Sequence, residues 1–148
     1  FKDDDERNIC KILKGSKITN NVAELTAILL AIESIIDKNK TSSFEKTHQI
    51  CLYTDSEYSM NCITKWANGW KKNDWKRKNK GKVQEVKNKS LIKQIHEYYC
   101  QYNIRFVHVR SHQPEPMNKN SLKYKIWYGN DMADKFATHA SKKSMNSY

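Results

Sequence analysis

The segment Ile50-Cys51-Leu52-Tyr53-Thr54-Asp55-Ser56 places an acidic residue directly after a short apolar run. An apolar run of this length is typical of a buried strand. Ser56 belongs to the residue types that cap helices, and we expect a helix from Glu57 to about residue 64. Because active sites of α/β proteins gather at the carboxyl ends of strands, Asp55 is a candidate functional residue.

The flanking residues alternate between strand and helix patterns. Residues 23–36 and 90–102 have helical apolar spacing, and Asn20 or Asn21 can cap the first of these helices. Residues 9–13 and 104–109 alternate as strands, with a second short strand possible up to Ile18. We expect polar loops over residues 38–48 and 110–128, then a helix over residues 130–140 with a frayed tail after Ser141. This order predicts an α/β fold.

Length and composition indicate one folded domain over residues 1–148. No apolar run approaches the length of a membrane span and no signal-peptide pattern is present, so we expect no membrane partner. We also expect a monomer. The cysteines have no metal-finger spacing, which favours reduced, mostly buried thiols in an intracellular protein: Cys10, Cys51, Cys62 and Cys100.

The positive charge is concentrated in residues 65–89. This segment holds ten Lys or Arg residues against two acids, which is +8 of the chain's net charge of +11. Gly81 marks a loop within it. A block of charge this dense favours a polyanionic partner, and nucleic acid is the class that best fits it.

Two further acids lie near the starts of predicted helices, whereas Asp55 lies at the end of a predicted strand. Glu24 ends Thr19-Asn20-Asn21-Val22-Ala23-Glu24, and Asp134 ends Gly129-Asn130-Asp131-Met132-Ala133-Asp134. Carboxylates at element ends can converge on a hard divalent cation, which prefers oxygen ligands. The alternative is structural: Asp55 and Asp134 cap or solvate helix ends, and Glu24 lies on an exposed face.

Five motifs give the chain a resemblance to the type 1 ribonuclease H family, and they occur in the family's order: Thr19-Asn20-Asn21-x-Ala23-Glu24-Leu25, Tyr53-Thr54-Asp55-Ser56, Ile63-Thr64-x-Trp66-x-x-x-Trp70-Lys71-Lys72-x-x-Trp75-Lys76, Ser111-His112 and Gly129-Asn130-x-x-Ala133-Asp134. The resemblance covers nearly the whole chain. It implies a ribonuclease H-like fold, in which helices flank a mixed five-stranded sheet.

The resemblance also implies an activity. Family members are endonucleases that hydrolyse the RNA strand of RNA/DNA hybrids and leave 5′-phosphate and 3′-hydroxyl ends. By that resemblance Glu24, Asp55 and Asp134 hold two Mg²⁺ ions, or Mn²⁺, and His112 on a loop helps to position water or to release product. The alternatives are a non-catalytic module that binds hybrids or double-stranded RNA, and a related integrase or resolvase-type nuclease of the same fold.

A second group of residues matches the family's substrate contacts. The basic segment resembles the protrusion that grips the DNA strand, with Trp66 and Trp70 facing substrate and Trp75 structural. The alternative is buried tryptophans beside a solvated lysine face, with Asn20 acting only as a cap. The implied contacts are to phosphates for Thr19, Asn88, Lys71, Lys72, Lys76, Arg77 and Lys78, to the region of the RNA 2′-hydroxyls for Asn20 and Asn21, and to the DNA groove for Tyr58.

The chain departs from the family pattern in two places. Residues 113–129 form a much longer connection than usual, with an extra segment at about residues 115–127 that suggests a flap or a substrate contact. The family's first strand, which is central and carries a fourth carboxylate, has no counterpart, and Asp3, Asp4 and Asp5 fit a hairpin turn better. We expect the 148 residues to be a portion of a longer polypeptide that supplies this strand; the alternative is a strand from another chain.

Overall fold

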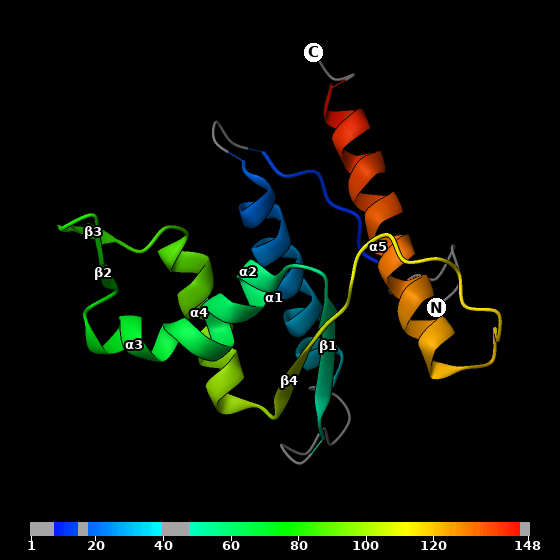
Figure 1. Cartoon of the computed structure of the whole chain (residues 1–148), viewed down its shortest axis with the longest axis horizontal. Helices are drawn as coiled ribbons and strands as arrows, with labels where there is room; N and C mark the ends of the chain where they lie inside the picture. Colours follow the sequence, from blue (N-terminus) through cyan, green and yellow to red (C-terminus); the bar gives the residue numbers. More distant parts are fainter. Residues whose placement is uncertain (1–7, 15–17, 40–47, 146–148) are drawn as a thin grey trace. The chain divides into compact units, whose positions relative to one another are not determined.

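The computed structural model describes residues 8–14, 18–39 and 48–145, without the side chains of residues 38–39 and 143–145 (Figure 1). The chain divides into two compact units, which are described separately. The first unit takes its described residues from 1–18, 53–55 and 108–148. The second unit takes them from 19–52 and 56–107.

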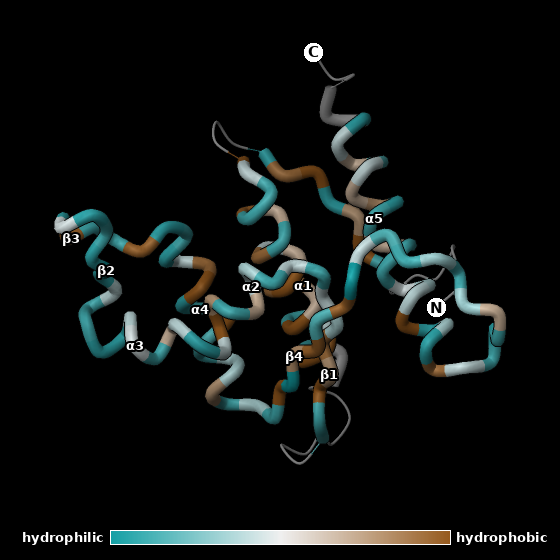
Figure 2. The backbone as a smooth tube through the Cα atoms, viewed as in Figure 1, coloured by the Kyte–Doolittle hydropathy of each residue, from teal (hydrophilic) through white to brown (hydrophobic). Residues whose placement is uncertain are grey.

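The second unit is built around a helical core. Its helices are α1 (Asn20–Asn39), α2 (Glu57–Asn61), the π-helix η1 (Cys62–Trp66), α3 (Ala67–Lys72) and α4 (Lys89–Gln101). Apolar positions of α1 and α4 carry the brown of hydrophobic residues in Figure 2. The largest apolar side chains that are almost completely removed from solvent come from α1, η1 and α4: Leu25, Ile32, Ile63, Ile92 and Ile95. Those of α1 and α4 lie in the two segments whose apolar spacing predicts helices.

The two predicted helix starts have different outcomes. The Ser56 Oγ accepts a hydrogen bond of 3.2 Å from the Ser59 backbone N–H, so the predicted cap is confirmed. The Asn20 and Asn21 cap is wrong, because α1 already begins at Asn20 and the Thr19 Oγ1 accepts from the Val22 N–H at 3.3 Å. The helical path after Ser56 also continues to Lys72, beyond the expected end near residue 64.

The strands predicted before Asp55 and after Asn103 are both present. Strand β1 (Ile50–Thr54) pairs with β4 (Ile104–His108). The Ile50 N–H donates to the Asn103 carbonyl, and the Val109 N–H donates to the Thr54 carbonyl, both at 2.9 Å. Because residue numbers rise together along both strands, the pair is parallel. Asp55 therefore follows the carboxyl end of β1, as the sequence predicts.

The basic segment contains a hairpin that sequence patterns did not predict. Strands β2 (Lys76–Asn79) and β3 (Lys82–Glu85) pair antiparallel, with Lys76 opposite Glu85 and Asn79 opposite Lys82. Lys80 and Gly81 join them with φ values of 48° and 77°. Positive φ at both turn residues is typical of the type I′ turn that two-residue hairpins favour, and Gly81 is the loop residue expected there.

The described residues contain four strands in two two-stranded sheets, so the five-stranded sheet is not formed within them. Residues 9–13 are not a strand, and Ile9 is 50% exposed. Their alternation is insufficient because a strand needs a hydrogen-bonded neighbour, and no described segment pairs with them. Three predicted parts lie outside the described residues: the acidic turn at Asp3–Asp5, residues 15–17 with the Gly15-Ser16 turn and the start of the possible second strand, and residues 40–47 of the first loop.

Helix α5 (Leu122–Met145) dominates the first unit, and it corrects three expectations. It starts eight residues before residue 130, it includes the end of the expected loop 110–128, and it continues past Ser141. The early start follows from Ser121, whose Oγ accepts from the Tyr124 N–H at 3.1 Å. Cys10 lies against this helix and contacts the Phe136 carbonyl through its Sγ at 3.3 Å.

The cysteines are free thiols, but the expected burial is wrong for three of them. Only Cys62 is buried, while Cys10, Cys51 and Cys100 are exposed. Cys51 is exposed because side chains alternate along β1, where Ile50 and Leu52 face the core. None of the helices in the described ranges has both the length and the apolar character needed to cross a membrane.

Candidate active site

Asp55 and Asp134 interact within the first unit. Burial raises the pKa of Asp134, the negative charges of Asp55 and Asp131 raise it further, and His112 opposes them. Two carboxylates that repel each other in this way favour either a proton or a cation between them. Their chemistry therefore fits a hard divalent cation, whose charge would remove the repulsion.

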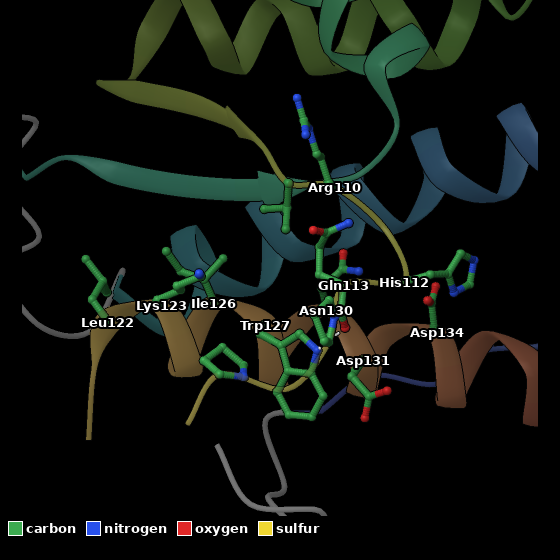
Figure 3. Close-up of a pocket in the computed structure, with 13 residues that line it drawn as sticks. Arg110, His112, Gln113, Leu122, Lys123, Ile126, Trp127, Asn130, Asp131 and Asp134 are labelled. Atoms are coloured by element: carbon green, nitrogen blue, oxygen red, sulfur yellow. Dashed lines mark hydrogen bonds between the residues drawn. The ribbon is translucent and has the colours of Figure 1, made fainter. Parts of the chain in front are cut away.

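His112 lies beside Asp134. Figure 3 shows its imidazole next to the Asp134 carboxylate, at one end of the cavity formed by α5 and the preceding loop. The His112 backbone has a φ of 53°, which is uncommon for a residue other than glycine. Its side chain is exposed. The structure thus brings the predicted loop histidine next to one of the predicted carboxylates.

Asp55 is fixed through its backbone. The His108 Nε2 lies 3.3 Å from the Asp55 carbonyl oxygen. Together with the bond between Val109 N–H and the Thr54 carbonyl, this contact anchors the end of β1 to the end of β4. Within the described part of the chain, no hydrogen bond or ion pair engages the Asp55 carboxylate. No sequence pattern identified His108 as a support of the site.

Glu24 is held in the second unit by two serines. The Ser56 hydroxyl donates to the Glu24 Oε2, and the Ser59 hydroxyl lies 3.5 Å from the same oxygen. Both serines are buried, and Glu24 is half-buried rather than on an exposed face. Ser56 directly follows Asp55 in the sequence. Sequence reasoning assigned Ser56 only a capping role, although the Ser56-x-x-Ser59 spacing places both hydroxyls on the first turn of α2.

Among the described residues, no group of three or more His, Cys, Asp or Glu side chains is gathered in the arrangement of a metal site. Asp55 and Asp134 belong to the first unit, whereas Glu24 belongs to the second. The roles of these residues as metal ligands therefore remain predictions.

An aromatic surface forms in the second unit. The rings of Tyr58 and Trp66 have centroids 6.3 Å apart, and those of Trp66 and Trp70 lie 5.7 Å apart. Trp66 is 41% exposed, whereas Tyr58 and Trp70 pack partly against the core. Trp75 is only 7% exposed and meets the His96 ring edge-on, in agreement with its predicted structural role. Within this surface, Trp66 thus offers the most accessible ring for stacking.

Tyr58 also joins a polar cluster. Burial and a hydrogen bond with Cys62 raise the pKa of Tyr58 to about 12, while Arg77 and a hydrogen bond with Asn88 oppose that rise. Burial likewise raises the pKa of Cys62 to about 11. Both groups stay protonated at neutral pH. Asn88 stands at the start of α4 with a left-handed φ of 58°, and the Arg77 Nε is buried with no hydrogen-bond partner among the described residues.

The remaining predicted contacts are accessible. Thr19, Asn20, Lys71, Lys72 and Lys76 are exposed, and Asn21 is half-buried. Lys71 and Lys72 end α3, and Lys76 begins β2, where it forms an exposed ion pair of 3.3 Å with Asp74. The Thr19 hydroxyl can donate to a ligand while it accepts the α1 capping bond.

Comparison with known proteins identifies the family. The family model described as RNase H matches residues 1–142. The chain is 36% identical over 137 residues to "Ribonuclease H" of Schizosaccharomyces pombe, covering 93% of this chain and 42% of that protein. It is 34% identical over 126 residues to "Probable ribonuclease H" of Acanthamoeba polyphaga mimivirus, covering 85% of this chain and 49% of that protein.

A bacterial relative is matched over more of its own length. The chain is 33% identical over 115 residues to "Ribonuclease H" of Caldicellulosiruptor saccharolyticus, covering 76% of this chain and 71% of that protein. By contrast, the chain spans less than half the length of the yeast and viral relatives. The matched residues include every motif that carries the resemblance, and the chain belongs to the ribonuclease H family.

Proposed function

We propose that this protein is a metal-dependent endonuclease that hydrolyses the RNA strand of RNA/DNA hybrids, leaving 5′-phosphate and 3′-hydroxyl ends. The observation that carries the proposal is the placement of Asp55, Asp134 and His112 in one unit, with the His112 ring beside the Asp134 carboxylate, at the positions where the family motifs place two acids and a histidine. The negative charge of Asp55, which raises the pKa of Asp134, supports it. Relatives from yeast, a virus and a bacterium bear the name ribonuclease H, which supports the same activity.

Glu24, Asp55 and Asp134 would hold the metal ions. Two divalent cations, Mg²⁺ or Mn²⁺, would supply a water activated for attack on the scissile phosphate and would neutralise charge on the leaving 3′ oxygen. The Ser56 and Ser59 hydroxyls keep the Glu24 carboxylate oriented. His112, beside Asp134, moves a proton at the water or at the leaving oxygen.

The second unit would bind the hybrid. The exposed Trp66 ring stacks on the DNA strand together with Trp70 and Tyr58. Phosphates would be met by the lysines Lys71, Lys72 and Lys76 and by Thr19 and Asn88. The α1 residues Asn20 and Asn21 would contact the hybrid near the RNA 2′-hydroxyls. This surface is supported by its charge, which contributes +8 over residues 65–89.

The test of this proposal compares four end-labelled duplexes of one sequence: RNA/DNA, RNA/RNA, DNA/DNA and an RNA/DNA duplex with 2′-O-methyl RNA. The protein is expected to cleave the RNA strand of the first duplex alone when Mg²⁺ is present, and EDTA is expected to stop it. Binding of the hybrid without any cleavage in Mg²⁺ or Mn²⁺ would instead identify a non-catalytic binding module.

A further inference from the structure

The extra segment after His112 forms one wall of a cavity in the first unit. The cavity has a volume of about 470 Å³ and lies between the loop after β4 and the first turns of α5 (Figure 3). The Trp127 Nε1–H donates to the Gln113 carbonyl at 2.8 Å, which fastens the loop to the helix. Part of the lining comes from the extra segment expected at about residues 115–127, namely Pro116, Leu122, Lys123, Ile126 and Trp127.

The lining of the cavity is suited to a flat, partly polar ligand. Apolar groups supply most of the wall, among them Pro114, Leu122, Ile126 and the Trp127 indole. The Trp127 ring is held by its hydrogen bond and by the Tyr124 ring, whose centroid lies 5.6 Å away. A ring fixed in this way presents a surface for stacking without a further loss of side-chain freedom.

Charge on the lining favours an anion at one end. Lys123 is exposed and lines the cavity, whereas the nearby Asp131 carboxylate is paired with Lys135 at 2.7 Å. The Arg110 guanidinium points away from Trp127 in Figure 3, so Lys123 is the cation best placed to meet an anionic group. A nucleotide could stack its base on the Trp127 indole and place its phosphate next to the Lys123 ammonium.

The cavity shares two residues with the candidate active site, both in the first unit. His112 and Asp134 both line it, at the end opposite Leu122 (Figure 3). Its volume falls within the range of sites that enclose small organic groups. A base within a duplex is covered by its neighbours and its pairing partner, so only a base outside the duplex can enter such a space.

We propose that this cavity binds one unpaired nucleotide of the RNA strand, in a single-stranded tail next to the hybrid. The assignment to the RNA strand rests on the proposed function, because it is the RNA phosphate that His112 and Asp134 would face. The insertion would thereby favour hybrids that carry an RNA tail of one polarity, since the cavity lies on one side of the reacting groups.

The test measures binding of three hybrids by fluorescence anisotropy in EDTA, where no cleavage occurs. The hybrids share one duplex and are blunt, or carry a three-nucleotide RNA tail at the 5′ or the 3′ end. The variants are Trp127→Ala and Lys123→Glu, with Lys125→Glu as the matched control. Lys125 is exposed on the same helix but does not line the cavity. Lys125→Glu therefore changes the net charge by the same amount as Lys123→Glu without altering the cavity wall.

The expected result is that one tail, and not the other, tightens binding to the wild-type chain by about tenfold. This gain should be lost in Trp127→Ala and Lys123→Glu and kept in Lys125→Glu. The proposal is overturned by equal affinity for all three hybrids, by an equal gain from both tails, or by a gain that Lys123→Glu retains. If Trp127→Ala fails to fold, the exposed Lys123 decides the outcome.

Failure of this proposal can be separated from failure of the proposed function. Cleavage of the blunt hybrid in Mg²⁺ tests the activity, and the tail-dependent gain in affinity tests the cavity. A chain that cleaves the blunt hybrid but ignores both tails loses only the cavity assignment. A chain that binds one tail through Lys123 without cleaving any hybrid keeps the cavity and loses the nuclease assignment.

Discussion

The hydroxyl of Ser56 donates a hydrogen bond to the carboxylate of Glu24, which comes from a different helix. The same hydroxyl oxygen accepts the first capping bond of α2. One small side chain thus fixes a helix start and a candidate metal ligand. Because Ser56 follows Asp55 directly, the backbone that carries one acid also supports the other.

Removing this hydroxyl should therefore be costly. We expect Ser56→Ala to lower the free energy of unfolding by about 1–2 kcal/mol, since it removes a cap and leaves a half-buried carboxylate with one bond fewer. Urea denaturation measures the change. The matched control is Ser90→Ala in α4, whose exposed hydroxyl accepts, within the described part of the chain, only from the exposed Gln94, and it should change stability by less than about 0.5 kcal/mol. Equal effects of both variants would contradict the assigned role of Ser56.

The raised pKa of Asp134 predicts a pH-dependent stability difference. A carboxyl group whose pKa is higher in the folded state contributes stability below its unfolded pKa, and this contribution is lost as pH rises through the folded pKa. Asp134→Asn should therefore raise the melting temperature at neutral pH without metal, on the order of a degree or two for a partly exposed group. The gain should vanish below about pH 4, near the unfolded pKa.

Divalent metal should reverse that comparison. If Asp134 is a ligand, added Mg²⁺ or Mn²⁺ stabilises the wild-type chain more than Asp134→Asn, because the cation offsets the repulsion from Asp55. Thermal melts with and without metal at pH 7 measure the difference. A melting temperature that responds identically to metal in both chains would argue against Asp134 as a ligand.

Substitutions of two tryptophans in the basic segment should have different effects on hybrid affinity and on the free energy of unfolding. Trp66→Ala should weaken hybrid binding by about tenfold and cost less stability than Trp75→Ala, because the Trp66 ring is 41% exposed and packs against the Tyr58 and Trp70 rings. Trp75→Ala should cost about 3–5 kcal/mol of stability, because that ring is buried. Anisotropy titrations and urea denaturation distinguish the two. A large loss of stability in Trp66→Ala with unchanged hybrid affinity would show that Trp66 stabilises the fold and does not bind the substrate.

The lysines next to these rings should control the salt dependence of binding. Replacing Lys71, Lys72 and Lys76 by Ala should reduce the slope of log affinity against log salt by about two to three, one unit for each lost phosphate contact. A triple Ala variant of Lys11, Lys125 and Lys142 removes equal charge at exposed positions elsewhere. An unchanged slope in the first variant, or an equal change in both, would exclude the basic segment as the binding surface.

Local sequence patterns correctly predicted the strands β1 and β4. The apolar run before Asp55 and the alternation of residues 104–109 were sufficient for β1 and β4, because these strands find each other within the chain. Residues 9–13 have the same alternation and form no strand in the described structure. Alternation reports which face can be buried, whereas pairing depends on a neighbour that a local pattern does not contain.

Helix ends and side-chain anchors were harder to predict. Thr19 and Asn20 are both good caps, and only the geometry of α1 shows that Thr19 has this role. The early start of α5 depends on Ser121 in a segment whose prolines and polar residues resemble a loop. The bonds from Ser56 to Glu24 and from Trp127 to Gln113 join residues far apart in sequence, so spacing alone could not predict them.

The central claim is that Asp55 serves hybrid cleavage through bound metal. Single-turnover cleavage of an end-labelled RNA/DNA hybrid in Mg²⁺ tests it most directly, with wild type, Asp55→Asn and the control Glu57→Gln, an exposed acid two residues away. We predict that Asp55→Asn loses at least about a hundredfold in rate, at unchanged hybrid affinity, while Glu57→Gln stays close to wild type. Cleavage by Asp55→Asn at the wild-type rate would contradict the account.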